Sequence, residues 1–155
     1  RRSRGAHPVI AWMCDAARAA NVGPMAAVAG AFAAHIGQEI LKYTGQVIVE
    51  NGGDIFLKSD IKRHISVYAG NSPLSEVTGL EIDSKDTPLG ICTSSGVIGH
   101  SLSFGKADAV VVLSKSAALA DAGLAYRHLP ELAPTTELRQ VQYREDARVG
   151  VGKRR

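Results

Sequence analysis

The chain has 155 residues, of which 45% are apolar, and a formal net charge of +3. A single domain of this length buries about 70% of the surface of its unfolded chain, so its fold needs no disulfide. The basic excess lies at the ends, in Arg1, Arg2 and Arg4 and in residues 126–155, where seven Lys or Arg accompany four Asp or Glu. Because residues 5–125 carry an acidic excess instead, the sequence argues against a nucleic-acid-binding face.

Cysteine usage and hydropathy indicate a cytoplasmic protein. Cys14 and Cys92 lack the C-x-x-C spacing of a metal or redox pair, and as small hydrophobic residues they suit a reducing compartment. The most apolar stretch, residues 22–36, is shorter than the roughly 20 residues that span a bilayer. We therefore expect no membrane partner and no nucleic-acid partner.

Two helices are predicted first along the chain. The His7-Pro8 pair opens a helix that runs to about Ala20, and Pro24 opens a second helix that runs to about Tyr43. The second helix carries two stripes at helical spacing. The large stripe is Met25, Val28, Phe32, Ile36 and Ile40, and the small stripe is Ala26, Gly30, Ala33 and Gly37. We expect a buried core helix whose small stripe allows a neighbouring element to pack very close.

Beyond Gly45 the pattern changes to that of short strands. The segments Gln46–Glu50 and Ile55–Lys58 flank ENGGD, which predicts a hairpin because Asn-Gly accepts the positive φ angles of tight turns. Four further strands are expected, at Ile65–Ala69, Leu80–Ile82, Leu89–Cys92 and Ala109–Leu113. Ser116 is a candidate cap for a last helix, AALADAGLAY. This order predicts an α+β fold with a mostly antiparallel sheet packed against helices.

The last thirty residues differ from the rest. They contain two prolines, many charges and few large apolar side chains, and they lack the period of a core element. We therefore expect one α+β domain over residues 1–125, with its ordered core at about 7–122. A divergent basic tail over 126–155 would add little to that core.

Three joints rich in Gly or Ser lie at the ends of predicted elements. They are NVGPMAAVAG (21–30), VENGGDIFL (49–57) and CTSSGVIGHSLSFGKADAVVVLSKSAALADA (92–122). Such joints can bring backbone N–H groups close to a phosphate, and a helix N-terminus adds a favourable dipole. Each joint can also be a simple turn. Their occurrence together with Asp54, His100, Asp108 and Asp121 favours a binding site.

Together these segments resemble the ApbE-like superfamily, which includes the FAD:protein FMN transferases, and most closely an uncharacterised sister family. The resemblance lies in VGPMAAVAGAFA, VENGGDIFL and TSSGVIGHSLSFGKADAV, and it covers about residues 7–122. It implies an α+β fold that holds FAD or FMN beside a divalent metal, usually Mg²⁺. In the transferases the FAD pyrophosphate is cut, and FMN is linked to a Thr or Ser hydroxyl of a target protein.

The resemblance also implies the positions of a cofactor and metal site. The flavin-binding positions are Gly23, Met25, Ala26, Gly30, Asn51, Gly52, Gly53, Asp54, Thr93, Ser94, Ser95 and Gly96. The metal ligands would be the Asp121 carboxylate and the Ala26 backbone carbonyl, since hard oxygen ligands suit Mg²⁺. The transferases place a Thr four residues after that Asp, where Ala125 offers no oxygen, so we expect a weakened metal site. From about residue 123 the chain departs from the family, which implies an incomplete version of the family fold.

Ser95 and His100 are the candidate catalytic residues. The TSSG segment would aim N–H and hydroxyl groups at a phosphate or at the target hydroxyl, and an imidazole suits proton removal at neutral pH. Other interpretations stay open. His100 alternatively hydrogen-bonds a neighbouring carbonyl, and Asp54 either orders the hairpin turn or faces the site. Asp108 and Lys106 either form an ion pair or anchor the strand that follows them.

Three hypotheses about function follow. The first is a flavin-binding ApbE-like protein, with Mg²⁺-dependent transfer of FMN from FAD to a protein substrate. The second is a factor of sulfur or amino-acid metabolism that uses Cys92 or Cys14 as a thiol carrier, because the sister family is linked with homocysteine formation. The third is a non-catalytic remnant of the fold, favoured by Ala125 and the divergent C-terminus. A homodimer is an open alternative for the oligomeric state.

Overall fold

The computed structural model describes residues 5–73, 75–95, 108–125, 139–143 and 150–152. The helices are α1 (Pro8–Ala20), α2 (Val28–Ile40) and α3 (Ala117–Ala125), with 3-10 turns at Pro24–Ala27 and Ser84–Asp86. The larger sheet holds, in spatial order, β1 (Val47–Asn51), β2 (Asp54–Lys58), β5 (Leu89–Ser94), β6 (Ala109–Ser114), β7 (Arg139–Tyr143) and β8 (Gly150–Gly152). A separate ribbon pairs β3 (Arg63–Ser66) with β4 (Gly79–Ile82), and every strand pair among these is antiparallel. The predicted α+β class is confirmed.

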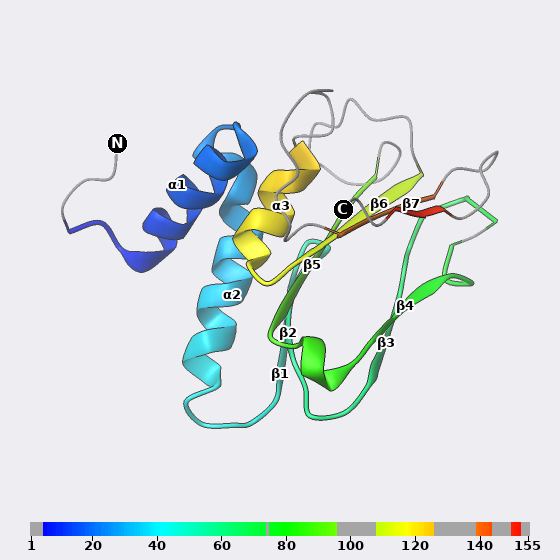
Figure 1. Cartoon of the computed structure of the whole chain (residues 1–155), viewed down its shortest axis with the longest axis horizontal. Coiled ribbons are helices and arrows are strands. Elements are labelled where there is room, and N and C mark those ends of the chain that lie inside the picture. The colour runs from blue at the N-terminus through cyan, green and yellow to red at the C-terminus, as the bar shows by residue number, and fades with distance from the viewer. Residues whose placement is uncertain (1–4, 74, 96–107, 126–138, 144–149, 153–155) are drawn as a thin grey trace.

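The larger sheet is the middle layer of the molecule. Successive side chains of a strand point to opposite faces of its sheet. Leu57 of β2 therefore packs with Ile82 of the ribbon, whereas its neighbour Phe56 packs with Ala33 of α2 and Ala117 of α3. The helices thus cover one face of the sheet and the β3–β4 ribbon covers the other, as Figure 1 shows.

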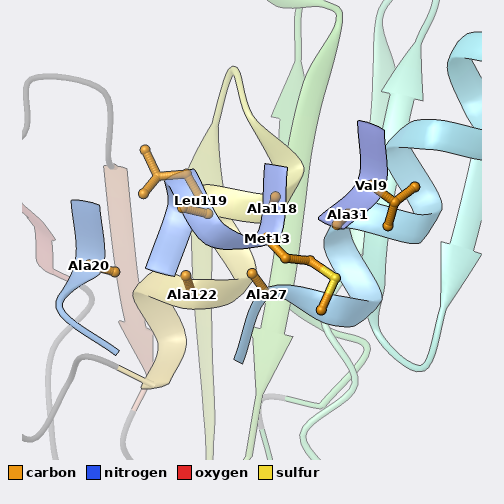
Figure 2. Close-up of a cluster of buried hydrophobic side chains, with 9 residues drawn as sticks. Val9, Met13, Ala20, Ala27, Ala31, Ala118, Leu119 and Ala122 are labelled. Atoms are coloured by element: carbon orange, nitrogen blue, oxygen red, sulfur yellow. The ribbon is translucent and has the colours of Figure 1, made fainter. Parts of the chain in front are cut away.

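Small side chains bring the helices close together. Figure 2 shows the cluster that α1, the 3-10 turn, α2 and α3 share, with Val9, Met13, Ala20, Ala27, Ala31, Ala118, Leu119 and Ala122 labelled. Because most of these side chains are single methyl groups, the helix backbones can approach one another closely while the interior stays filled. The site residues of α2 and α3 are positioned by this packing.

The small stripe of α2 faces the interior, as predicted. Gly30, Ala33 and Gly37 are buried. A Cβ atom on Gly30 would overlap the carbonyl oxygen of Ala117, and one on Gly37 would overlap the ring of Phe56. Glycine at these two positions therefore lets α3 and the sheet approach the backbone of α2.

Apart from Val28, which packs partly buried against the helix cluster, the large stripe lies on the outside, so α2 is buried along its small stripe. Met25, Phe32, Ile36 and Ile40 are between 40% and 70% exposed. The physical reason is the close approach just described, because the space between α2 and its neighbours admits glycine and alanine and excludes larger side chains.

Most other predicted elements are present with shifted ends. The hairpin is confirmed, with Asn51 paired to Asp54 and with Gly52 and Gly53 at φ angles of 63° and 99°. The second helix begins as a 3-10 turn and becomes α-helical only at Val28. The strand expected from Ile65 lies slightly earlier, as β3.

Two strands lie in the stretch where a tail was expected. β7 pairs with β6, from Ala109 opposite Tyr143 to Leu113 opposite Arg139, and β8 pairs with β7. The small contribution of residues 126–155 to the stability of the core stays a prediction.

Of the described helices, none is by itself long and apolar enough to cross a bilayer. The α1 helix and residues 24–40 reach that length and composition only when taken together, across a bend of 107°.

Candidate functional site

The carboxylate of Asp121 lies at the N-terminus of α2. Its Oδ2 atom accepts a hydrogen bond of 2.9 Å from the backbone N–H of Gly30, across 91 residues of sequence. Gly30 is the third residue of α2, so its N–H belongs to the first turn, whose donors have no acceptor within the helix. The side chain of Ala27, which precedes α2, offers no cap. Asp121 therefore caps α2 from another helix and places its charge where the helix dipole is positive.

The tip of the β1–β2 hairpin lies beside the same helix end. The Asn51 side-chain amide donates to the carbonyl oxygen of Ala29 at 3.4 Å. On the other side of the tip, the backbone N–H of Thr93 donates to the carbonyl oxygen of Gly53 at 3.1 Å. The tip is stabilised internally by a 2.7 Å hydrogen bond from the Gly53 N–H to the Glu50 carboxylate. The hairpin tip is thus fixed between α2 and the end of β5.

The three segments of the sequence prediction therefore meet in one place. We call it the α2–hairpin junction and define it by Ala29, Gly30, Asn51, Gly53, Asp54, Cys92, Thr93 and Asp121. It combines a helix N-terminus, a glycine-rich tip, a strand end that bears hydroxyls, and two carboxyl groups.

Asp54 is the most unusual residue of the junction. It begins β2 opposite Cys92 of β5 and is only 8% exposed. Among the described residues its Oδ1 atom, which is fully buried, has no hydrogen-bond partner. Burial raises the pKa of Asp54 to about 7, the charge of Asp121 adds to this rise, and the Cys92 side chain opposes it. Asp54 lies two residues before Phe56 in β2, so its side chain is on the face of the sheet that the helices cover. Its role in a binding site stays a prediction.

Asp121 is also held in a desolvated environment. Burial raises its pKa to about 6, while hydrogen bonds from the backbone N–H groups of Gly30 and Ala29 act in the opposite direction. The negative charge of Asp121 in turn disfavours the ionisation of Asp54. The junction therefore has a surplus of negative charge when both are ionised.

Cys92 is unsuited to act as a thiolate. It is fully buried, its thiol donates to the Ala117 carbonyl oxygen at 3.5 Å, and burial and then the Asp54 charge raise its pKa well above the ordinary value. Nucleophilic cysteines need the opposite conditions, which are positive surroundings and access to solvent. The other thiol, Cys14, lies half-buried on α1.

The remaining predicted site residues are more scattered. Gly23 and Met25 lie exposed at the turn before α2, and Ala26 lies half-buried in the same turn. Ser94 and Ser95 lie half-buried at and just after the end of β5. His100, Gly96 and Lys106 lie outside the described residues, so the base proposed at His100 and the ion pair with Asp108 stay predictions.

Sequence reasoning missed the pairing of Asp54 with Cys92. Only the register of β2 against β5 places these two side chains together, and no spacing in the sequence encodes that register. It also missed Ala117, whose carbonyl oxygen bonds Cys92 and whose backbone limits the side chain at Gly30.

Within the described residues no group of three or more His, Cys, Asp or Glu side chains is placed to hold a metal ion. The candidate ligand atoms of the junction nevertheless suit a hard cation, because they are oxygens. One of them, the buried Oδ1 atom of Asp54, has no hydrogen-bond partner within the described residues.

Comparison with known proteins agrees with the predicted membership of an uncharacterised family. A UPF0280 protein of Methanococcus vannielii is 46% identical over 123 residues, which cover 77% of this chain and 50% of that protein. UPF0280 proteins of Methanobrevibacter smithii and Methanospirillum hungatei are 48% and 49% identical, over 76% and 74% of this chain and 49% and 47% of theirs. The chain thus spans about half the length of the curated relatives it matches. The model of the family described as "AbpE bacteria" matches residues 1–125, and the chain belongs to that family.

Proposed function

We propose that the α2–hairpin junction is part of a flavin-nucleotide site. The observation that carries the proposal is the convergence itself. Hydrogen bonds join α2 to α3 through Gly30 and Asp121, α2 to the hairpin tip through Asn51, and the tip to β5 through Thr93. The segments that carry the resemblance to the ApbE-like superfamily, separate in sequence, are thereby brought to one end of the sheet.

The junction offers groups that suit the phosphates of a nucleotide. The N-terminus of α2 provides a favourable dipole, and Gly52 and Gly53 carry no side chain that would keep a ligand away from the backbone. Thr93, Ser94 and Ser95 supply hydroxyl groups at the end of β5 and just beyond it. These features support phosphate binding more than they support any particular flavin.

A cation is required if phosphates bind beside two carboxyl groups, since all of these groups are negative. Asp121 and the Ala26 carbonyl are the residues that would hold Mg²⁺ there, and the Oδ1 atom of Asp54, for which the described part of the chain offers no hydrogen-bond partner, suits the same cation. Mg²⁺ held by these residues would supply positive charge to neutralise the charge that develops on the pyrophosphate.

The reaction that we propose for this site is the transfer of FMN from FAD to a protein hydroxyl. The acceptor oxygen would form a bond to the phosphorus of the FMN half, the bond between that phosphorus and the bridging oxygen would break, and AMP would leave. His100 would take the proton of the acceptor hydroxyl, and Ser95 would orient the phosphate or that hydroxyl.

The test is flavin binding by this chain, measured by quenching of FAD fluorescence in MgCl₂. Asn51→Ala removes the bond between the hairpin tip and α2 and should weaken FAD affinity by at least about tenfold. Asn71→Ala, which alters another exposed asparagine, is the matched control and should leave affinity unchanged. Absence of FAD and FMN binding to the unaltered chain, or equal affinity of the two variants, would refute the proposal.

A further inference from the structure

Large apolar side chains are exposed along α2 and the strand that follows it. Phe32, Ile36 and Ile40 are spaced four residues apart, so they form one ridge of the helix. Tyr43 lies in the turn after α2, and Ile48 lies on β1. Each of these five residues is between 40% and 90% exposed. We call them, together with the backbone of β1, the edge surface.

The ridge lies on the side of α2 that faces β1, away from α1. Ala33 shares a buried cluster with Val47 of β1, and Ile36 and Ile40 follow Ala33 by three and seven residues, a spacing that places them on the same side of the helix. The α1 helix meets α2 at His35 instead, whose ring contacts an aromatic ring of α1. Figure 1 shows the C-terminal half of α2 extending past both α1 and α3.

The strand beside this ridge is an edge strand. In the part of the chain that the structure describes, β1 is paired on one side only, with β2. Every second residue of such a strand directs its N–H and C=O groups away from the sheet. Proteins commonly block an exposed edge with Lys, Pro or a bulge, but Val47–Asn51 contains neither residue and its register against β2 is unbroken. The edge of β1 is therefore open to another strand.

The charges near the edge surface are few and are already compensated. Residues 28–51 contain three Asp, Glu, Lys or Arg residues, which are Glu39, Lys42 and Glu50. Glu39 and Lys42 form an ion pair of 2.6 Å, and Glu50 accepts a hydrogen bond from the Gly53 N–H. A single lysine does not suit an anionic lipid surface, which attracts clusters of basic residues. The same surface can, however, meet a copy of itself without strong repulsion.

We propose that the edge surface binds the edge surface of a second copy of this chain, in a symmetric dimer. β1 pairs antiparallel with β1 of the partner, so that the two larger sheets become continuous. The two α2 ridges then pack against each other over the new strand pair. One two-fold axis relates both contacts, because two identical antiparallel strands are themselves related by such an axis.

The area of the edge surface fits a specific dimer. At about 150–250 Å² for each large side chain, the exposed fractions of the five residues amount to roughly 400–700 Å². The β1 backbone and the shorter side chains between them add to this area. Each partner of a standard stable interface provides about 800 Å². Because the surface lies at the lower end of that range, we expect a dissociation constant on the order of 10 µM.

The experiment is sedimentation velocity of the whole chain from about 1 to 200 µM. We expect a monomer at the lowest concentration and twice that mass at the highest, so unfolding measured at about 1 µM reports the single chain. Ile36→Glu places like charges near the two-fold axis, because Ile36 is the middle residue of the ridge, and should weaken dimerisation by at least about tenfold. Ile10→Glu is the matched control, since Ile10 is 46% exposed and Ile36 45%, but it lies on α1. It should dimerise as the unaltered chain does.

Hydrogen exchange of the unaltered chain tests the strand pairing without any variant. The amides of residues 47–51 should exchange more slowly at about 200 µM than at about 1 µM. A dimer without this slowing would refute the pairing through β1. A monomer at every concentration would leave the edge surface to a different partner and overturn the proposal. Equal association of folded Ile36→Glu and the unaltered chain, with folding checked by circular dichroism, would also overturn it.

Discussion

Gly30 and Asp121 lie 91 residues apart in the sequence, yet a 2.9 Å hydrogen bond joins the backbone N–H of one to the carboxylate of the other. The bond depends on the missing side chain at Gly30. A Cβ atom there would overlap the Ala117 carbonyl oxygen and would lie 2.9 Å from the Cβ atom of Asp121. The close approach of α2 and α3 at Gly30 is therefore also the point where a carboxylate reaches the helix N-terminus.

Gly30→Ala should destabilise the protein, although alanine is the better helix former by about 1 kcal/mol. The added methyl group overlaps backbone atoms of α3, which cannot rotate away, so we expect a net loss of about 1–3 kcal/mol in the free energy of unfolding by urea. Gly23→Ala is the control, because nothing lies within 4 Å of its added Cβ and its φ of −72° suits alanine. Equal stability of the two variants would show that α2 and α3 are further apart than described.

The two stripes of α2 should respond oppositely to substitution. Ala33 is fully buried, so Ala33→Leu overfills the space and should cost about 1–3 kcal/mol. Ile36 is 45% exposed, so Ile36→Gln should change the free energy of unfolding by less than about 1 kcal/mol. Guanidinium unfolding followed by circular dichroism measures both. A larger loss in Ile36→Gln than in Ala33→Leu would show that the large stripe is the buried one.

The free energy of unfolding in EDTA should fall as pH rises from 4 to 8. Burial raises the pKa of Asp54 from 3.8 to about 7 and that of Asp121 from 3.8 to about 6. An acid with a raised pKa binds more protons when the chain is folded, so its stabilisation is complete below about pH 4 and is lost as pH rises through the folded pKa. The loss should be on the order of a few kcal/mol.

Asp54→Asn tests the source of this pH dependence. The variant cannot ionise at that position, so it should lose most of the fall and be more stable than the unaltered chain at pH 8. Asp60→Asn, which alters an exposed acid, should keep the fall. Urea unfolding at pH 5 and pH 8 gives the comparison, and an unchanged fall in Asp54→Asn would place its origin elsewhere.

Cys92 should resist alkylation in the folded protein. It is fully buried, and burial raises the pKa of its thiol well above the ordinary value, whereas Cys14 is half-buried. Iodoacetamide at pH 8 should therefore label Cys14 first, and both cysteines only in guanidinium, as peptide mass spectrometry would show. In Cys14→Ser the folded chain should stay unlabelled. Rapid labelling of Cys92 would instead favour the thiol-carrier hypothesis.

Local signals in the sequence predicted the local structure well. The Asn-Gly pair marks the hairpin, Pro24 marks the turn that leads into α2, and apolar periods distinguish helices from strands. Both stripes of α2 repeat at the same spacing, however, and only the approach of α3 decides which one is inside. The strand β7 offers too short a pattern to recognise, with Val141 as its one aliphatic residue.

The same contrast between local signals and tertiary contacts holds for the candidate site. Family resemblance singled out Gly30, Asn51, Asp54 and Asp121, and the structure brings their segments together. It did not reveal that Asp54 is buried against Cys92, because that contact follows from a strand register between distant parts of the chain.

The pairing of β7 with β6 has a consequence for solubility. Val110, Val111 and Val112 of β6 are buried, and β7 occupies the outer side of this apolar strand. If residues 139–143 were cut away or displaced, the N–H and C=O groups along one side of β6 would form an open, strongly hydrophobic strand edge. Such edges recruit strands from other molecules. The C-terminal segment would then protect the fold from self-association, and its removal would first appear as turbidity rather than as a loss of helix.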